Sequence, residues 1–450
     1  MAGGAERSSG LSGNRNWRLL FAGQAVSLIG DAVFDLTLVL WVGTVIAARF
    51  SWAPAAVSGV LVAASGPILV IGPIAGVYVD RWDRRRIMMT TDLIRAALVA
   101  VLIVVAVAGR HLPVGLQLAA VYGVVALAST ASQFFNPARF AMIEAVVNER
   151  DRARAFSLAQ ASVSVASVIG PPLAAPLLIG AGVYWALVIN ALSFIVSFVS
   201  VRLIRLERSS ERTAGSAEPK RFRTEFAEGI RFFAASPMLL VLAGALCIYT
   251  LGVGALNALD VFFVKDNLNA SVSWLGFLTG GFGIGSIAGA LLAAPAAKRI
   301  SAARLFCMGL TLAGVIMIVY ARMTLLPAGI VVLALGGIPV GAVSALVGPL
   351  VLKATPAGLI GRVTAVLNPL MQLAAIASMA LAGFLASTVL LHMHVVLAGI
   401  HMHRIDTIFS VSALLMIASG LATLRPMLRA ESAVPEGHGA LVPESSRAEG

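Results

Sequence analysis

The chain has few charged residues and almost no cysteine. Charged residues make up 12% of its 450 positions and hydrophobic residues 59%, whereas soluble proteins carry roughly 25% charged residues. This composition argues against a soluble enzyme. The two cysteines, Cys247 and Cys307, both lie in apolar stretches, so we expect no disulfide framework.

Motifs for catalysis and nucleotide binding are also missing. The sequence contains no glycine-rich phosphate loop, no zinc-protease helix and no nucleophile elbow. His-x-His pairs occur near the C-terminal end, but this spacing places both rings on one face only in an extended chain. The four histidines are His392, His394, His401 and His403. We therefore expect a protein that is not an enzyme, with no cofactor and no metal site.

Long apolar runs dominate the chain instead. Each is close to the roughly 20 residues that cross a hydrocarbon core about 30 Å thick. The twelve runs lie near residues 18–46, 55–79, 87–109, 114–136, 156–181, 183–204, 238–264, 273–296, 303–321, 327–352, 364–390 and 405–424. They predict an all-α polytopic membrane protein with twelve transmembrane helices. The first run is too long, and lacks the cleavage site, for a cleavable signal peptide.

The twelve runs fall into two groups of six on either side of a polar, basic linker. The predicted parts are a disordered tail (1–13), a first six-helix bundle (14–204), the linker (205–236), a second six-helix bundle (237–424) and a disordered tail (425–450). Similar openings of the first and seventh runs, at 17–23 and 238–244, support a duplication. A duplicated transporter binds its ligand where the halves meet.

An amphipathic helix is predicted within the linker. Its apolar residues fall on one stripe at helical spacing, and they are Phe222, Phe226, Ile230 and Phe233. A helix with this pattern is expected to lie on the membrane surface.

The net charge of +12 is explained by topology rather than by a nucleic-acid partner. Of the 33 Lys and Arg residues, 28 fall on the tails, the central linker and the even-numbered connections with their flanking helix ends. The five on the opposite side are Arg49, Arg110, Lys265, Arg322 and Arg404. By the positive-inside rule, both termini are expected to be cytoplasmic, in the cell inner (plasma) membrane.

A charged motif occupies the connection between the second and third runs. It reads Gly-Val-Tyr-Val-Asp-Arg-Trp-Asp-Arg-Arg-Arg over residues 76–86 and resembles the G-x-x-x-D-R-x-G-R-R signature of the major facilitator superfamily. The matching residues are Gly76, Asp80, Arg81, Arg84 and Arg85. The continuation, with Asp92 and Arg95, resembles the branch of enterobactin exporters and macrolide efflux proteins.

The resemblance implies the major facilitator fold, two pseudo-symmetric six-helix bundles. It also implies that Asp80 faces the start of helix 11, where a helix N-terminus favours a carboxylate. With the arginines, Asp80 would form a gate that locks the cytoplasmic side in one conformation. A basic turn that serves only topology is the alternative.

A second resemblance lies in the fifth run, at Gly170, Pro171 and Pro172. Exporters of the superfamily carry G-x-x-x-G-P-x-x-G-G in helix 5, and alanine stands at three of the glycine positions here. The resemblance implies an antiporter in which this bent, small-residue segment seals the halves against leakage. A face of small residues that serves only packing explains the pattern almost as well.

Acidic residues inside the apolar runs are few, costly and therefore informative. Asp31 and Asp35 are four residues apart and share a helix face with Gln24, and Asp31 is expected near mid-bilayer. Two neighbouring carboxylates in a low dielectric suit a group that binds and releases a proton, and contact with a cationic substrate is an alternative. The second alternative is a purely structural role, in which one carboxylate bonds to a neighbouring helix and the other reaches the outer interface.

Asp260 is a second acidic candidate, with Asn257 one turn before it. It is expected towards the outer end of the seventh run, where Lys265 could make it a simple interfacial pair. A role in proton coupling or substrate contact is the other interpretation.

No arginine is predicted at mid-depth. In particular, Arg139 follows Asn136-Pro137 near the predicted cytoplasmic end of the fourth run. The fourth run therefore lacks the embedded arginine that many drug:proton antiporters carry. An acidic but not basic interior favours neutral or cationic ligands over anionic ones.

Together these features predict a secondary active transporter that exports hydrophobic or amphipathic small molecules by proton-coupled alternating access. The molecules would be drugs, antibiotics or secondary metabolites, and the proton gradient would be the driving force. We expect a monomer. A siderophore exporter is the nearest alternative, and a non-transporting membrane sensor or assembly protein is the alternative of another class.

Overall fold

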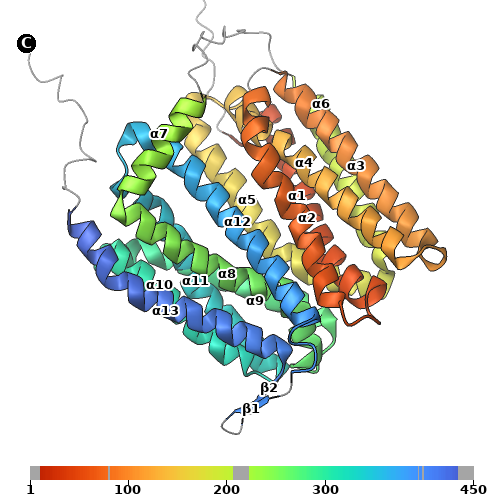
Figure 1. The fold of residues 1–450 in the computed structure, drawn as a ribbon. Coiled ribbons are helices and arrows are strands. Elements are labelled where there is room, and N and C mark those ends of the chain that lie inside the picture. Colours follow the sequence, from red (N-terminus) through yellow and green to blue (C-terminus); the bar gives the residue numbers. More distant parts are fainter. Residues whose placement is uncertain (1–10, 80–81, 206–221, 394, 398–399, 434–450) are drawn as a thin grey trace, which may run out of the picture.

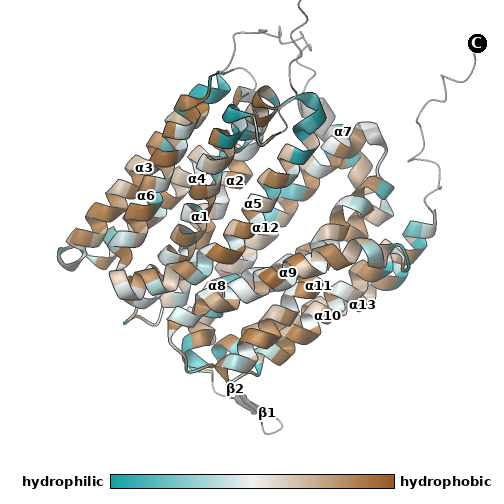
Figure 2. Cartoon of the chain, turned by 180° about the vertical axis from the view of Figure 1, so that it is seen from behind, coloured by the Kyte–Doolittle hydropathy of each residue, from teal (hydrophilic) through white to brown (hydrophobic). Residues whose placement is uncertain are grey.

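The computed structural model describes residues 11–79, 82–205, 222–393, 395–397 and 400–433. In this part of the chain, twelve helices are long and apolar enough to cross a membrane, which confirms the predicted all-α polytopic fold. They form two bundles (Figure 1). Hydrophobic residues cover the middle of the helices, and hydrophilic residues gather near the end that carries α7 (Figure 2).

Each bundle consists of consecutive helices. The first bundle comprises α1 (Arg15–Trp41, continued as a π-helix to Ile46), α2 (Ala53–Val79), α3 (Arg84–Ala108), α4 (Val114–Val146), α5 (Glu149–Pro176, continued to Ala181) and α6 (Val183–Leu203). After α7 (Phe222–Ala235), the second comprises α8 (Pro237–Asp266), α9 (Leu275–Ala297), α10 (Ala302–Ala321), α11 (Leu326–Ala354), α12 (Ile360–Ser387) and α13 (Arg404–Ala433).

Three helices extend well beyond the predicted runs, and one of them, α5, begins at Glu149 rather than near residue 156. Helix α4 continues through Pro137 to Val146, because the residues beyond the proline, such as Ala138 and Met142, are completely buried. Helix α13 reaches Ala433 rather than ending near residue 424. Its last turns are fixed to the second bundle by the buried Met427 and by an ion pair of 3.1 Å between Glu431 and Lys353 of α11.

A short antiparallel hairpin stands in the connection between α12 and α13. Strands β1 (Val395–Leu397) and β2 (Ile400–Met402) pair there, at the end of the molecule opposite α7 (Figure 1). Of the four histidines in this connection, His394 lies outside the described residues and His392 is exposed. Within the described part of the chain, no group of three or more His, Cys, Asp or Glu residues could hold a metal ion.

Hydrogen bonds gather the ends of several helices at one end of the first bundle. At the start of α1, the Asn14 side chain donates to the Val146 carbonyl at 2.6 Å. Asn16 and Arg205 exchange hydrogen bonds of 2.9 and 3.2 Å. The start of α3, with Arg85, lies at this same end, next to the end of α6. We call this end, where Asn14, Asn16, Arg85 and Arg205 lie, the basic end of the molecule.

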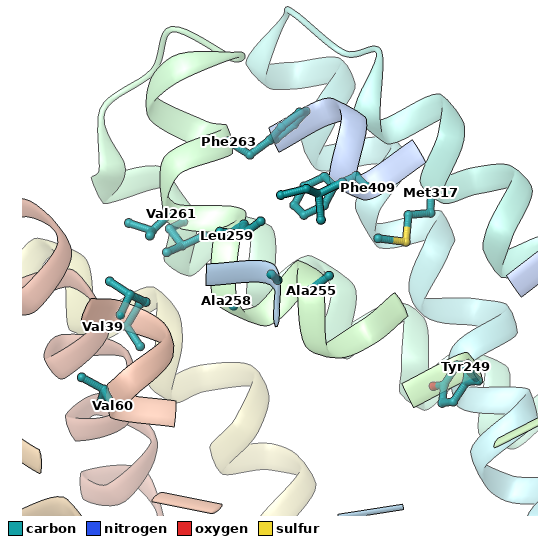
Figure 3. Close-up of a cluster of buried hydrophobic side chains, with 14 of the residues drawn as sticks. Val39, Val60, Tyr249, Ala255, Ala258, Leu259, Val261, Phe263, Met317 and Phe409 are labelled. Carbon is teal, nitrogen blue, oxygen red and sulfur yellow. The ribbon is translucent and has the colours of Figure 1, made fainter. Parts of the chain in front are cut away.

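The two bundles meet through α2 against α12 and through α5 against α9. Within the described residues, two hydrogen bonds join them. Ala55 N–H donates to Ser387 Oγ at 3.0 Å at the end opposite the basic end, and Gln372 Nε2 donates to the Ser65 carbonyl at 3.3 Å further along. Buried apolar side chains support the contact, with Val39 and Val60 of the first bundle near Val261 of α8 (Figure 3).

Helix α7 is fixed to the start of α12. Glu228 forms an ion pair with Arg362, and Phe233 is buried in the core of the second bundle. Of the apolar stripe predicted for this helix, Ile230 is exposed. The helix therefore belongs to the second bundle and leaves an apolar side chain on the surface.

Substituting Gly229 of α7 by alanine is expected to loosen this attachment. A Cβ at Gly229 would lie 2.9 Å from the Arg362 carbonyl oxygen, which belongs to a helix backbone and moves only at a cost of about 1–3 kcal/mol. Hydrogen exchange of the α7 amides should therefore become faster in Gly229→Ala. Gly358→Ala is the control, because a Cβ there meets nothing within 4 Å. Equal exchange in the two variants would contradict the packing described.

Candidate functional site

The gate motif lies partly outside the described residues. Asp80 and Arg81 are not described, and Gly76 lies in the last turns of α2. Arg85 donates to the carbonyls of Val201 and Arg202, at 3.2 and 2.5 Å. Arg85 thereby satisfies the last carbonyls of α6, which lack partners within the helix.

Arg84 makes a longer contact of 3.5 Å with the Ala141 carbonyl of α4. The described arginines of the motif thus bind backbone carbonyls of α6 and α4 within the first bundle.

A buried charge cluster lies further along α3. Arg95 donates to Asp92 Oδ1 at 2.6 Å, and its other terminal nitrogen lies 3.7 Å from Asp31 Oδ2 on α1. The side chains of Arg95 and Asp92 are 5% and 0% exposed, whereas that of Asp31 is 36% exposed. One arginine is therefore shared by a closely bound, buried carboxylate and a looser, accessible one.

The surroundings of Arg95 hold it in place. Its guanidinium lies 4.3 Å from the ring centres of both Phe135 of α4 and Phe194 of α6, a cation–π arrangement on two sides. Asp92 accepts a second hydrogen bond of 2.7 Å from Ser197. Gln24 of α1 donates to that Ser197 hydroxyl at 3.1 Å. The cluster links α1, α3, α4 and α6.

This arrangement changes three predictions. Asp92 and Arg95 lie in the interior of the first bundle with Asp31, whereas the sequence motif grouped them with the gate. The prediction that no arginine lies at mid-depth is wrong, because Arg95 contacts Asp31, which lies near the middle of the span from Arg15 to Ile46. Arg139 also lies inside the longer α4 and is 8% exposed, near enough to Asp31 and Arg95 to interact electrostatically.

The motif of α5 lies between neighbouring helices at the contact of the two bundles. Gly170 faces Ala32 of α1, where a Cβ would come within 2.4 Å of the Ala32 Cβ. Pro171 and Pro172 face α9 of the other bundle. A Cβ at Gly276 of α9 would lie only 2.2 Å from the Pro171 carbonyl oxygen. The absence of a side chain at Gly276 of α9 therefore permits backbone contact between the bundles.

A cavity of about 350 Å³ lies between the two bundles. It holds three of the predicted acidic and amide residues, Asp35 of α1 with Asn257 and Asp260 of α8. Asp260 accepts a hydrogen bond of 2.6 Å from Tyr320 of α10. The other lining residues are Ala32, Leu36, Val39, Leu61, Ser167, Pro171, Leu256, Val261, Leu275, Thr279, Phe282, Leu333 and Met379.

Two larger grooves lie elsewhere and involve one bundle each. A groove of about 700 Å³ lies between α3 and α4, and one of about 500 Å³ lies among α9, α10, α11 and α13. Both are lined by exposed apolar side chains, including Ile94 and Leu127 in the first and Leu312 in the second. Side chains of this kind suit contact with lipid. We therefore take the smaller cavity between the bundles as the candidate ligand site.

Four residues of the site were not found from the sequence, namely Ser197, Phe135, Phe194 and Tyr320. Each is of a type that usually packs or bridges helices without further function, and each lies far along the chain from its partner. Ser197 could have been predicted from the sequence, because a hydroxyl inside an apolar helix commonly forms a hydrogen bond to another helix. The two phenylalanines carried no such signal.

Comparison with known proteins agrees with this geometry. The family model described as a transmembrane secretion effector of the major facilitator superfamily matches residues 12–434. Two six-helix bundles with a cavity between them are the architecture expected of a transporter of this superfamily. The chain belongs to this family of the major facilitator superfamily, and it is a multi-pass membrane transport protein.

Curated relatives include efflux proteins. The chain is 27% identical to the multidrug efflux pump Tap of Mycolicibacterium fortuitum, covering 82% of this chain and 87% of that protein. It is 28% identical to macrolide efflux protein A of Streptococcus pyogenes, covering 62% and 66%. The uncharacterised MFS-type transporter YkuC of Bacillus subtilis is 24% identical, with 80% and 83% covered.

Solved structures show the same fold at low identity. A bacterial homologue of the iron transporter ferroportin, in an inward-facing state, superposes with a TM-score of 0.67 at 14% identity, covering 92% of this chain and 98% of that one. A bacterial homologue of the lysosomal transporter Spinster, also inward-facing, gives 0.65 at 15% identity, covering 93% and 96%.

Proposed function

We propose that the protein exports hydrophobic or amphipathic small molecules in exchange for protons. The observation that carries this proposal is the sharing of Arg95 between buried Asp92 and accessible Asp31. An exchanger needs a carboxylate that protons reach and whose charge state alters the protein around it. Asp31 meets both requirements, because it is open to solvent and one turn from Asp35 in the cavity.

The charge balance of the cluster explains how a proton would act. Asp31 and Asp92 carry two negative charges, and Arg95 and Arg139 carry two positive charges. A proton on Asp31 would remove its attraction to Arg95 and leave the cluster with one net positive charge. Movement of α1 relative to α3 would then be favoured, and α1 also lines the ligand cavity.

The basic end would face the cytoplasm, in the inner membrane, as the distribution of arginine and lysine suggests. The contacts described between the bundles lie at or towards the other end, which supports a cavity that opens to the cytoplasm in this conformation. Asp80 with Arg81, Arg84 and Arg85 would close the basic end in the alternate state. Residues 14–204 and 237–424 would form the cores of the two moving bundles.

Everted membrane vesicles test the exchange directly. They are prepared from a bacterial host that lacks its own efflux pumps and are acidified by respiration. We expect erythromycin, a macrolide, to release protons from vesicles that contain the protein. The double variant Asp31→Asn, Asp35→Asn should abolish this release, and Glu144→Gln, an exposed carboxylate outside the cavity, should preserve it. Normal release by the double variant would contradict the assignment.

A further inference from the structure

The cavity between the bundles has an unbalanced charge. It is lined by two carboxylates, Asp35 from the first bundle and Asp260 from the second, and no lysine or arginine is among its lining residues. The buried arginines of the first bundle, Arg95 and Arg139, belong to the cluster around Asp31 and Asp92. Positive charge is therefore missing from the cavity and is most readily supplied by a ligand.

Asp35 is available for such a ligand. Its side chain is exposed to the cavity and has no hydrogen bond or ion pair with any described residue. The other carboxylate on the same face of α1, Asp31, is already near Arg95. An unpaired carboxylate inside a membrane protein costs free energy unless a cation pairs with it. Binding of a cation to Asp35 is therefore favourable.

Asp260 is held in a defined orientation. The Tyr320 hydroxyl donates to its Oδ1 at 2.6 Å. Tyr320 is itself 1% exposed and packs against Phe263 and Phe409, with ring centres 4.7 and 6.3 Å away. Figure 3 shows Phe263 and Phe409 in this cluster, on the side of α8 away from the first bundle. The tyrosine fixes one oxygen of Asp260, and the described residues provide no hydrogen bond to the other oxygen.

The other residues that line the cavity suit an amphipathic organic molecule. Leu61, Leu256, Phe282 and Met379 supply apolar surface from four different helices. A few groups, including Asn257 and Thr279, supply hydrogen bonds. Mostly apolar pockets with a small number of placed polar groups are typical of sites for organic ligands.

From this placement we propose that the transported molecule is an amphipathic organic cation whose positive charge lies between Asp35 and Asp260 and so joins the two bundles. Tyr320 is a positioning residue that presents Asp260 to the cation. This assignment rests on the proposed transport function and adds the substrate class to it. A cation bound by both bundles would favour their closure around the ligand, because each bundle supplies one carboxylate.

Two probes of the same shape and opposite charge test the substrate class. Tetraphenylphosphonium and tetraphenylborate are each measured for binding to the purified full-length protein in detergent, by equilibrium dialysis against protein-free micelles. We expect the cation to bind and the anion not to bind. Asp35→Asn and Asp260→Asn should each weaken cation binding roughly 10- to 100-fold, and Glu144→Gln should not change it.

Tyr320→Phe separates positioning from mere packing, since it keeps the ring and removes the hydroxyl. Its cation affinity should fall roughly threefold to tenfold while its thermal stability in detergent stays close to that of the parent. Equal binding of the two probes, or cation binding that is unaffected in Asp35→Asn and Asp260→Asn, would overturn the substrate class. Because dialysis needs no proton gradient, selective cation binding without exchange in vesicles would instead reject the transport proposal.

Discussion

Replacing Asp31 by asparagine is expected to abolish substrate-driven proton release while the protein remains folded. Its pair with Arg95 is long, at 3.7 Å, and partly exposed, so its loss should cost less than about 1 kcal/mol of stability. The asparagine side chain has a similar shape but binds no proton. Asp31→Glu keeps the carboxylate and should restore part of the release.

Replacing Asp92 by asparagine should have a different effect. Asp92 is completely buried and binds Arg95 at 2.6 Å, so its loss leaves a buried guanidinium without its main partner, at a cost of about 3–5 kcal/mol. We expect Asp92→Asn to unfold at a clearly lower temperature in detergent and to reach the membrane in reduced amount.

Thermal unfolding in detergent and proton release in vesicles, measured on the same preparations, distinguish these two roles. Glu144→Gln serves as the control for loss of one carboxylate, because Glu144 is exposed on α4. The assignment of the proton to Asp31 is wrong if Asp31→Asn releases protons normally. The structural role of Asp92 is wrong if Asp92→Asn is as stable as Asp31→Asn.

The twelve spans could be predicted from the sequence because hydropathy is a local property. Each span must satisfy its own backbone hydrogen bonds and present apolar side chains over its length, so the run of residues alone defines it. The predicted end of α4 was wrong, because it was placed at a proline. Pro137 marked an expected end, but burial of Ala138 and Met142 against the rest of the bundle outweighs the lost hydrogen bond and the helix continues.

Only part of the site could be predicted from the sequence, because its side chains contact residues that lie far away along the chain. The spacing of Asp92 and Arg95 puts them on one helix face, yet nothing in that spacing shows that Asp31, 61 positions earlier in the sequence, shares the arginine. The cavity carboxylates could be found as rare intramembrane acids. Which of them pairs with an arginine, and which faces the cavity, depends on how α1 is rotated in its bundle.

The contact between α5 and α9 is the second feature with a large expected effect. A substitution at Gly276 of α9 by alanine should disturb the contact between the bundles at the end opposite the basic end, which we call the closed end because the proposed transport cycle keeps it closed in this conformation. The added Cβ would lie 2.2 Å from the carbonyl oxygen of Pro171, and a backbone atom in a proline-containing helix has little freedom to yield. The bundles must then separate at this point, since the two helices belong to different bundles.

The expected penalty is about 1–3 kcal/mol, which corresponds to a shift of about 5- to 150-fold between closed and open forms of this end. Gly281→Ala on the same helix is the matched control, because its Cβ would lie 3.5 Å from the Ala334 side chain, an ordinary contact.

The readout is labelling of a cysteine at Ser387, which bonds to Ala55 across the same closed end. Ser387→Cys is introduced after both native cysteines have been replaced by serine, and a membrane-impermeant maleimide is added to whole cells. Labelling should be slow with Gly281→Ala and several times faster with Gly276→Ala, and export should fall in the latter. Equal labelling in the two would mean that the contact of Gly276 with Pro171 does not hold this end closed. The small-residue motif of α5 would then be no more than a packing face within its own bundle.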